Sequence, residues 1–224
     1  MSNYFSKIPN FEYVSRLPDA KISDYIAVKN LFKKGFLRED IFQNLAYFTK
    51  YAIRGDDRPD NVAFDVYENS NLDWLVLTCN NIINVQTEWP LRQNDFDRVL
   101  LEKYGDYNTL YNGIHHYETV EIKNSQGVII VPAGLYVDSD HSVSYYDFFS
   151  ERQVSISSSD AITAVTNYEY ETEIEEKKRD IFVLKQRYLN IVEDDLEEIM
   201  TYKKGSSQYV TGTLKKADNI RLYQ

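Results

Sequence analysis

Cysteine is nearly absent from this chain, and long apolar runs are missing altogether. The one cysteine, Cys79, cannot form an intramolecular disulfide or supply a multi-cysteine zinc site. This usage indicates a protein made in a reducing compartment. The first 20 residues hold no apolar stretch of the kind that marks a secretion signal. No run approaches the ~20 apolar residues of a membrane span, so we expect no membrane partner.

Positive charge is also in short supply. The 25 Lys and Arg residues stand against 35 Asp and Glu residues, a formal net charge of −10. Affinity for nucleic acid comes largely from basic side chains clustered opposite phosphates, and the sequence shows no basic stripe. We therefore expect no nucleic-acid partner. Much of the acidity is local, because residues 169–198 hold eleven acidic and five basic residues.

The sequence lacks the usual signatures of catalysis and of metal binding. It has no GxSxG elbow, no HExxH helix and no glycine-rich phosphate loop. His115 and His116 are adjacent, so on a strand their side chains should point to opposite faces, and a metal site needs three or four converging ligands. The acidic residues at 194–195 and 197–198 fit the solvated face of a helix. We expect no catalytic residue, no metal and no cofactor.

Globular composition and an unusual number of tyrosines characterise what is present. Hydrophobic residues make up 43% of the chain and charged residues 27%, which predicts a packed core. The 19 tyrosines suit surfaces that become buried against partners, because each ring is large, rigid and tipped by a hydroxyl. Helical and strand-like patterns alternate along the chain, so the predicted fold class is α+β.

Residues 47–92 carry the clearest pattern, in the order strand, helix, helix, strand, after an N-terminal arm at 1–46. Alternation from Phe48 predicts the first strand, and Pro59 fits the first turn of a short helix. A second helix follows, and residues 82–91 are expected to return as the second strand, which makes the module's contacts local. The predicted core consists of Val62, Ala63, Val66, Leu72, Trp74, Leu75, Val76 and Cys79.

The remaining sequence divides into a mixed region at 93–169 and a helical region with a tail at 170–224. In the first, helical spacing between Asp95 and Gly105 is followed by a β-hairpin pattern around residues 117–136. In the second, Tyr170–Lys204 contains no Gly or Pro. Its apolar spacing predicts either one long helix with a shift of register or two helices.

Five segments in order carry a family likeness. Residues 55–81, GDDRPDNVAFDVYENSNLDWLVLTCNN, resemble the LysM pattern of a Gly-Asp turn and two short helices. Together with four further segments, this segment also resembles the baseplate wedge subunit of T4-type contractile-tailed phages that bridges neighbouring wedges. The other segments are YFSKIPNFEY at 4–13, EWPL at 88–91, EKYGD at 102–106 and EEKKRDIFVLKQRYLNIVEDDLEEIM at 175–200.

This resemblance implies a structural, non-enzymatic virion protein. It would be made in the host cytoplasm and incorporated in the tail baseplate, with a LysM-like fold used for protein contacts. Its partners would be other wedge subunits of the same phage, with multiple copies in a sixfold baseplate. The alternative is a LysM-type protein that binds peptidoglycan or chitin. Calorimetric titration with N-acetylglucosamine oligomers separates the two, because only the alternative predicts binding.

The candidate contact residues are one tryptophan and the apolar residues that recur at helical spacing in the C-terminal region, which we call the C-terminal stripe. Trp89 precedes Pro90, so it should be extended and exposed at a strand edge, where tryptophan is enriched as an interface anchor, whereas Trp74 should be mainly core. The C-terminal stripe packs either on its own domain or in a groove of another subunit. The candidate interface residues are Trp89, Ile181, Leu184, Tyr188 and Ile191.

Overall fold

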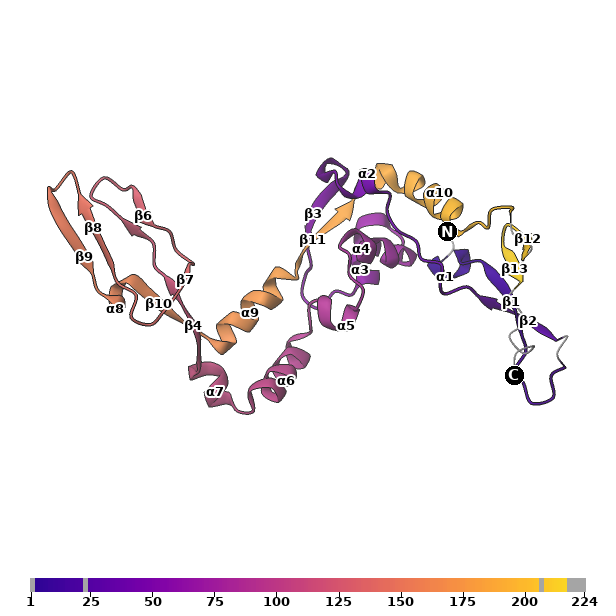
Figure 1. Ribbon diagram of the computed structural model, residues 1–224, viewed down its shortest axis with the longest axis horizontal. Coiled ribbons are helices and arrows are strands. Elements are labelled where there is room, and N and C mark those ends of the chain that lie inside the picture. The colour runs from indigo at the N-terminus through magenta and orange to yellow at the C-terminus, as the bar shows by residue number, and fades with distance from the viewer. Residues whose placement is uncertain (1–2, 22–23, 206–207, 217–224) are drawn as a thin grey trace. The chain divides into compact units, whose positions relative to one another are not determined.

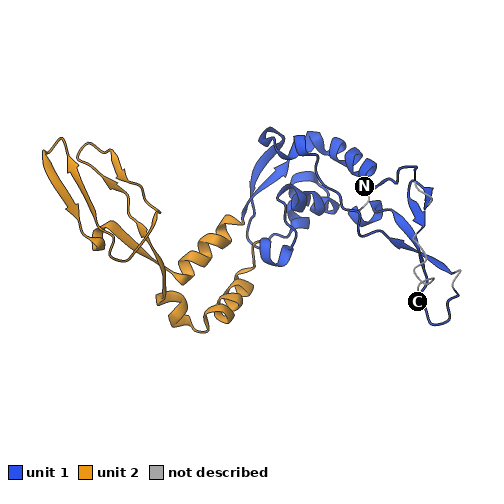
Figure 2. Cartoon of the chain, viewed as in Figure 1, with its two compact units in different colours: residues 1–89, 179–224 blue, residues 90–178 orange. Residues whose placement is uncertain are grey.

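The computed structural model describes residues 3–21, 24–205 and 208–216. Helices and strands both contribute substantially, so the predicted α+β class is confirmed (Figure 1). The chain forms two compact units, of which unit 1 comprises residues 1–89 and 179–224 and unit 2 comprises residues 90–178 (Figure 2). Unit 2 is therefore an insertion between two halves of unit 1. The predicted N-terminal arm and most of the C-terminal region belong to the same unit.

Unit 1 is built around a strand, two helices and a second strand that is distant in sequence. Strand β3 (Phe48–Ala52) pairs antiparallel with β11 (Asp180–Leu184), and Tyr51 lies opposite Ile181. Helices α3 (Pro59–Tyr67) and α4 (Asp73–Cys79) pack into the same core as these strands. Pro59 begins α3 where its missing N–H costs nothing. Glu68, with a φ of 57°, ends α3 by donating its backbone N–H to Phe64.

The prediction that residues 82–91 form the second strand is wrong. Val85–Glu88 is a short helix, α5, because the Asn84 side chain accepts a hydrogen bond from the Gln86 N–H and caps it. The second strand is β11, and Asn80 fixes its position. The Asn80 amide donates to the Phe182 carbonyl (2.9 Å) and accepts from the Phe182 N–H (2.8 Å). One side chain at the end of α4 thus holds the middle of β11.

The rest of unit 1 contains short helices and a four-stranded sheet formed from both terminal regions. The sheet order is β12-β13-β1-β2, with β1 and β13 parallel and the other pairs antiparallel. The remaining elements are α1 (Tyr4–Lys7), β1 (Asn10–Val14), β2 (Tyr25–Lys29), α2 (Glu39–Phe42), η1 (Leu45–Tyr47), η2 (Ser70–Leu72), η3 (Gln186–Tyr188), α10 (Leu189–Met200), β12 (Tyr209–Thr211) and β13 (Leu214–Lys216).

The C-terminal region is two helices separated by a strand. The first is α9 (Asn167–Lys177), and the second is α10. The two-helix alternative therefore holds in part, but β11 between the helices was not predicted. Helix α10 buries Leu196 and Met200 in a small cluster with Ile8 from the N-terminal region. This packing joins the two ends of the chain within unit 1.

Unit 2 has helices and a set of small sheets. The predicted helix and hairpin are both confirmed, as α6 and as the antiparallel pair of β5 and β6. A three-stranded sheet has the order β10-β4-β7, and β8 pairs with β9 in a second hairpin. The elements are α6 (Gln93–Tyr104), α7 (Tyr107–Asn112), β4 (Ile114–Thr119), β5 (Ile122–Lys123), β6 (Ile129–Val131), β7 (Tyr136–Val137), β8 (Val143–Asp147), β9 (Arg152–Ile156), α8 (Ser158–Ala161), β10 (Ile162–Thr166) and α9.

The core of unit 2 lies among its helices. Phe96, Leu100 and Leu110 form a buried cluster against which Tyr104 and Tyr168 pack. Helix α9 starts with a capping box, in which Thr166 and Glu169 exchange side-chain and backbone hydrogen bonds. The sheets have little core of their own. The buried residues within 114–166 are Thr119, Ile122, Asp147 and Ala161.

Candidate interaction surfaces

Among the residues that the structure describes, no group of three or more His, Cys, Asp or Glu side chains could hold a metal ion. His115 and His116 do not point to opposite faces as expected. Their Nδ1 atoms lie 2.9 Å apart, and His116 Nε2 lies 2.9 Å from a carboxylate oxygen of Glu118. The ring of His115 stacks on Tyr170 with centroids 3.7 Å apart. These contacts bind the two histidines to each other and to their neighbours within unit 2.

No described helix combines the length and apolar character that a membrane crossing requires.

Cys79 is buried at the end of α4, and burial raises the pKa of its thiol to about 12. Only the thiolate is a strong nucleophile, so the folded protein keeps this cysteine unreactive near neutral pH. We expect a maleimide or Ellman's reagent to label Cys79 at least about tenfold faster in denaturant than in native buffer. Stopped-flow or endpoint absorbance checks this. Equal rates in the two conditions would show that Cys79 is accessible.

Trp89 has a different environment from the one expected from the sequence. Trp89 is 5% exposed, and its Nε1–H donates to the backbone carbonyl of Asp57 at 2.9 Å. It is a core residue of unit 1 and not an exposed anchor. Trp74 is half-buried and lies against the ring of Tyr4, with centroids 5.5 Å apart. Trp89 is buried because residues 85–88 form a helix and not a strand edge, which places its side chain under the loop that contains Asp57.

The C-terminal stripe does not form one helix face. Ile181 and Leu184 lie on β11 and are 4% and 0% exposed, so they are core residues and not free contact residues. Tyr188 is half-buried and packs edge-to-face on Tyr47, with centroids 4.7 Å apart. Ile191, on α10, is 43% exposed and is therefore the stripe residue most open to a partner.

The predicted module core lies together in unit 1. Val62, Ala63, Leu72, Leu75, Val76 and Cys79 are buried in one cluster. Val66 and Trp74 are half-buried and pack against it. The cluster also contains residues of β11, which the sequence had placed in a helix.

Large apolar side chains are exposed on the hairpins of unit 2. Phe148 and Phe149, in the turn of the second hairpin, are 86% and 71% exposed. In the first hairpin, Ile129 is 51% exposed, and Leu135 and Tyr136 beyond it are 50% and 69% exposed. Exposed apolar side chains of this size are candidates for contact with another protein.

Asp147 organises the turn that presents Phe148 and Phe149. Its carboxylate accepts hydrogen bonds from the hydroxyls of Ser125 (2.6 Å) and Ser150 (2.9 Å) and from the Phe149 N–H (3.1 Å). The Ser125 hydroxyl holds the pKa of Asp147 below its ordinary value. Stabilisation by a carboxylate with a lowered pKa is present above about pH 4 and is lost as the pH falls through the lowered pKa.

We expect Asp147→Ala to loosen both hairpins of unit 2. Amide hydrogen exchange should speed up by about tenfold in residues 124–128 and 143–156, because the variant removes three hydrogen bonds to a buried carboxylate. The helix amides of α6 and α9 should be unchanged. Asp138→Ala, at an exposed position, is the control. Unchanged exchange in the hairpins of the Asp147 variant would contradict the assigned role.

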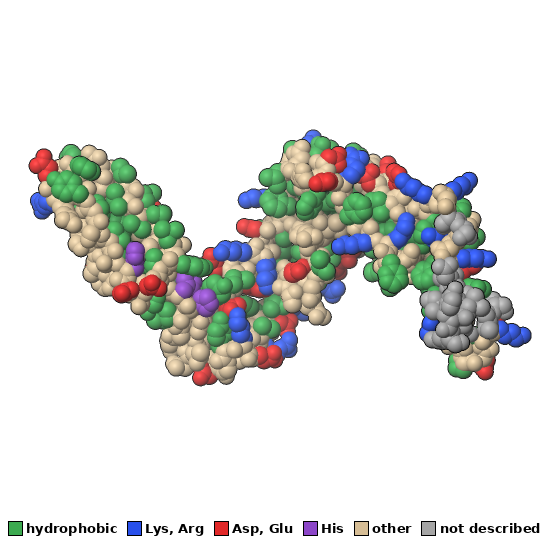
Figure 3. Space-filling model, in the orientation of Figure 1, with side chains coloured by type: hydrophobic (Ala, Val, Ile, Leu, Met, Phe, Trp, Pro, Cys, Tyr) green, Lys and Arg blue, Asp and Glu red, His purple; other side chains and the backbone are tan. Residues whose placement is uncertain are grey.

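Charge is distributed very unevenly over the chain. Unit 2, residues 90–178, contains sixteen acidic and seven basic residues. By contrast, residues 3–38 and 201–216, which carry the terminal sheet of unit 1, contain eleven basic and three acidic residues. The sequence showed no basic stripe because these lysines come from opposite ends of the chain. Folding gathers them in unit 1, where Figure 3 shows several of the basic side chains.

Lys33 lies within this basic region. Its Nζ donates to the carbonyls of Ile199 (2.6 Å) and Thr201 (3.1 Å) at the end of α10. Burial, followed by repulsion from Lys215 and Lys203, lowers the pKa of Lys33. The ammonium groups of Lys203 and Lys215 add positive charge around Lys33, and a carboxylate oxygen of Glu198 lies 3.4 Å from Lys203 Nζ. This part of unit 1 therefore favours an anionic neighbour.

Comparisons with known proteins show the family to which this chain belongs. Residues 3–201 match a family model described as base plate wedge protein 53, so the chain belongs to this family of phage baseplate proteins. It is 26% identical to "Baseplate wedge protein gp53" of Enterobacteria phage T4 over 186 residues, which cover 75% of this chain and 87% of that protein. The resemblance to the wedge subunit is confirmed.

Membership of this family defines the coarse function. The chain is a structural protein of the phage tail baseplate, and it assembles there with other baseplate subunits. The match covers both units of the fold, because it runs from residue 3 to residue 201. Both units therefore belong to the family's common architecture.

Proposed function

We propose that this chain joins adjacent wedges of the baseplate through protein contacts and that it does so without enzymatic activity. The observation that carries the proposal is the division into two units, each with its own buried cluster and its own exposed apolar residues. A chain with two separate contact surfaces can hold two different neighbours. The resemblance to a subunit that bridges wedges supports the same role.

The sheets of unit 2 support a role in assembly. A two-stranded hairpin is marginally stable in water unless further strands or a helix cover it. Two hairpins of unit 2, β5–β6 and β8–β9, are two-stranded, and Ile122 and Asp147 are their buried residues. Their exposed apolar side chains would gain a cover when a neighbouring subunit binds. A stable contact of this kind needs about 800 Å² per partner.

The order β3, α3, α4, β11 supports the proposal that this module is a LysM-like scaffold. Its two strands pair antiparallel, and its two helices fill the core beside them. We propose that the scaffold serves protein contacts in the virion. The insertion of unit 2 before the second strand would let one scaffold carry a second contact unit without lengthening either terminus.

Sedimentation velocity tests the proposal. The remaining wedge subunits, co-expressed without this chain, should sediment as single wedges, and adding the wild-type chain should produce a faster species containing several wedges. A chain with both Phe148→Ser and Phe149→Ser serves as a matched variant, because both side chains are exposed and contribute little to folding. This variant should bind single wedges but should join them less efficiently than the wild-type chain does. Association of wedges to the same extent without the chain would contradict the proposed function.

A further inference from the structure

The loop from Asn30 to Phe36 runs among three hollows of unit 1. A hollow of about 400 Å³ is lined by Lys33 and Lys215, and one of about 220 Å³ is lined by Lys34 and Phe36. A third, of about 230 Å³, is lined by Phe32 and by Lys215 again. We call this area the lysine-aromatic surface. It is defined by Phe32, Lys33, Lys34, Phe36, Lys215 and Lys216.

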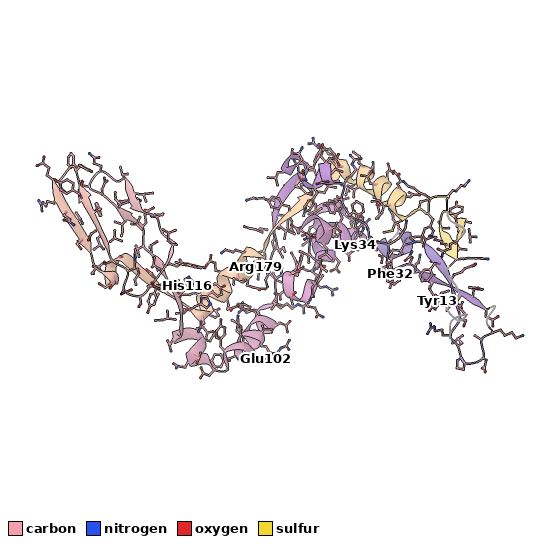
Figure 4. The ribbon with its side chains drawn as sticks, in the orientation of Figure 1. Tyr13, Phe32, Lys34, Glu102, His116 and Arg179 are labelled. Carbon is pink, nitrogen blue, oxygen red and sulfur yellow. The ribbon has the colours of Figure 1, made fainter. Side chains whose placement is uncertain are left out.

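The loop is held in place although its apolar side chains face solvent. The Asn30 amide donates to the hydroxyl of Tyr202 (2.8 Å), and the Phe32 N–H donates to the Asn30 side chain (3.2 Å). At the other end, the Gly35 N–H donates to the Tyr4 hydroxyl (2.9 Å). Phe32, which Figure 4 labels, lies on this loop. Its side chain is nevertheless 94% exposed. The tethered backbone of the loop is preorganised for a partner, since it requires little further ordering on binding.

Charge defines the chemistry of that partner. The hollows are lined by four lysines in addition to Lys34, and Glu198 is their one acidic lining residue within the described parts of the chain. A partner that fills them must bring carboxylates, and it must also bring an apolar side chain for the hollow beside Phe36 and Phe42. Complementary charges of this kind select the partner and its orientation.

We propose that the lysine-aromatic surface docks an acidic segment of another wedge subunit, in which carboxylates flank a large apolar side chain. This proposal rests on the proposed assembly function and names one of its contacts. A protein segment is favoured over DNA or an anionic bilayer, because the hollows are concave and partly apolar. Helix α10 also places Glu198 in the lining of the first hollow, and this carboxylate would repel an extended polyanion.

Two variants of the full chain test the surface. Phe32→Ser removes the exposed ring, and a double variant, Lys34→Glu with Lys216→Glu, reverses two exposed charges. Lys50→Glu, at an exposed position on β3, is the matched charge control. Each chain is co-expressed with the other wedge subunits and recovered through an affinity tag. We expect both surface variants to recover about tenfold less of one wedge subunit than wild type and Lys50→Glu do, with unchanged thermal melting.

Carbodiimide coupling of the wild-type complex identifies the partner segment. It joins a lysine amine to a carboxylate in contact with it, so mass spectrometry should find Lys34 or Lys216 linked to an acidic stretch of a wedge subunit. If both variants recover as much of every wedge subunit as wild type does, the surface is not a docking site, and the proposed assembly function still stands. Failure of the wild-type chain to recover any wedge subunit would overturn both. A third outcome is that the wild-type chain binds a DNA duplex or phosphatidylserine vesicles and gives no protein cross-link. If both variants abolished that binding, the partner would not be a protein segment.

Discussion

A chain that ends at residue 169 should fail to fold unit 1. Truncation there removes β11, which pairs with all five residues of β3. It also removes Ile181, Val183 and Leu184, none more than 4% exposed, from the core. Deleting one such side chain costs ~2 to 5 kcal/mol, so losing all three rivals the ~5 to 15 kcal/mol of a whole domain. Far-ultraviolet circular dichroism should show no cooperative melt for unit 1.

The matched control removes unit 2 and keeps both halves of unit 1. Residues 89 and 179 can be joined by a short Gly-Ser linker, because both ends are anchored to the same segment. Trp89 donates to the Asp57 carbonyl, and the Arg179 carbonyl accepts from the Ile53 N–H (2.9 Å). This chain should retain a cooperative melt. A folded module in the truncated chain would show that β11 is not part of the core. An unfolded linked chain would show that unit 1 does not fold without unit 2.

Trp89→Ala should destabilise unit 1 more than Trp74→Ala does. Replacing a buried tryptophan leaves a cavity and typically costs ~3 to 5 kcal/mol, and here the variant also removes the donor to the Asp57 carbonyl. For a chain of this size, that cost lowers the melting temperature by roughly 6 to 20 °C. Trp74 is half-buried and loses less. A larger fall for Trp74→Ala, measured by differential scanning calorimetry, would contradict the burial described here.

Much of unit 1 is predictable from local sequence, but its second strand is not. Pro59 marks the start of α3 and Asn80 the end of α4, and apolar spacing identifies the buried faces of both helices. In β11, Ile181 and Val183 are buried as strand alternation requires, yet Leu184 at the end of the strand is buried as well. Ile181 and Leu184 therefore stand three residues apart, as on a helix. Without a Gly or Pro nearby, the residues alone could not separate strand from helix.

The candidate contact residues were harder to predict than the fold class or the family. The tryptophan and stripe residues were chosen for their apolar character, and burial in the same chain uses the same character. The basic surface depends on long-range pairing, because the parallel register of Asn10 with Leu214 brings lysines of both terminal regions into one sheet. The net charge of the whole chain therefore does not reveal this local excess of basic residues. The isolated exposure of Phe32 likewise depends on how Asn30 and Gly35 are tethered.

Cross-linking across a mixed-isotope baseplate tests the joining of wedges most directly. Wedges that carry the unlabelled chain are mixed with ¹⁵N-labelled wedges prepared without it, assembled, cross-linked and analysed by mass spectrometry. A chain that joins adjacent wedges should give links from its peptides both to unlabelled and to ¹⁵N-labelled subunits. Links confined to unlabelled subunits, in rings shown to contain both kinds of wedge, would contradict the account.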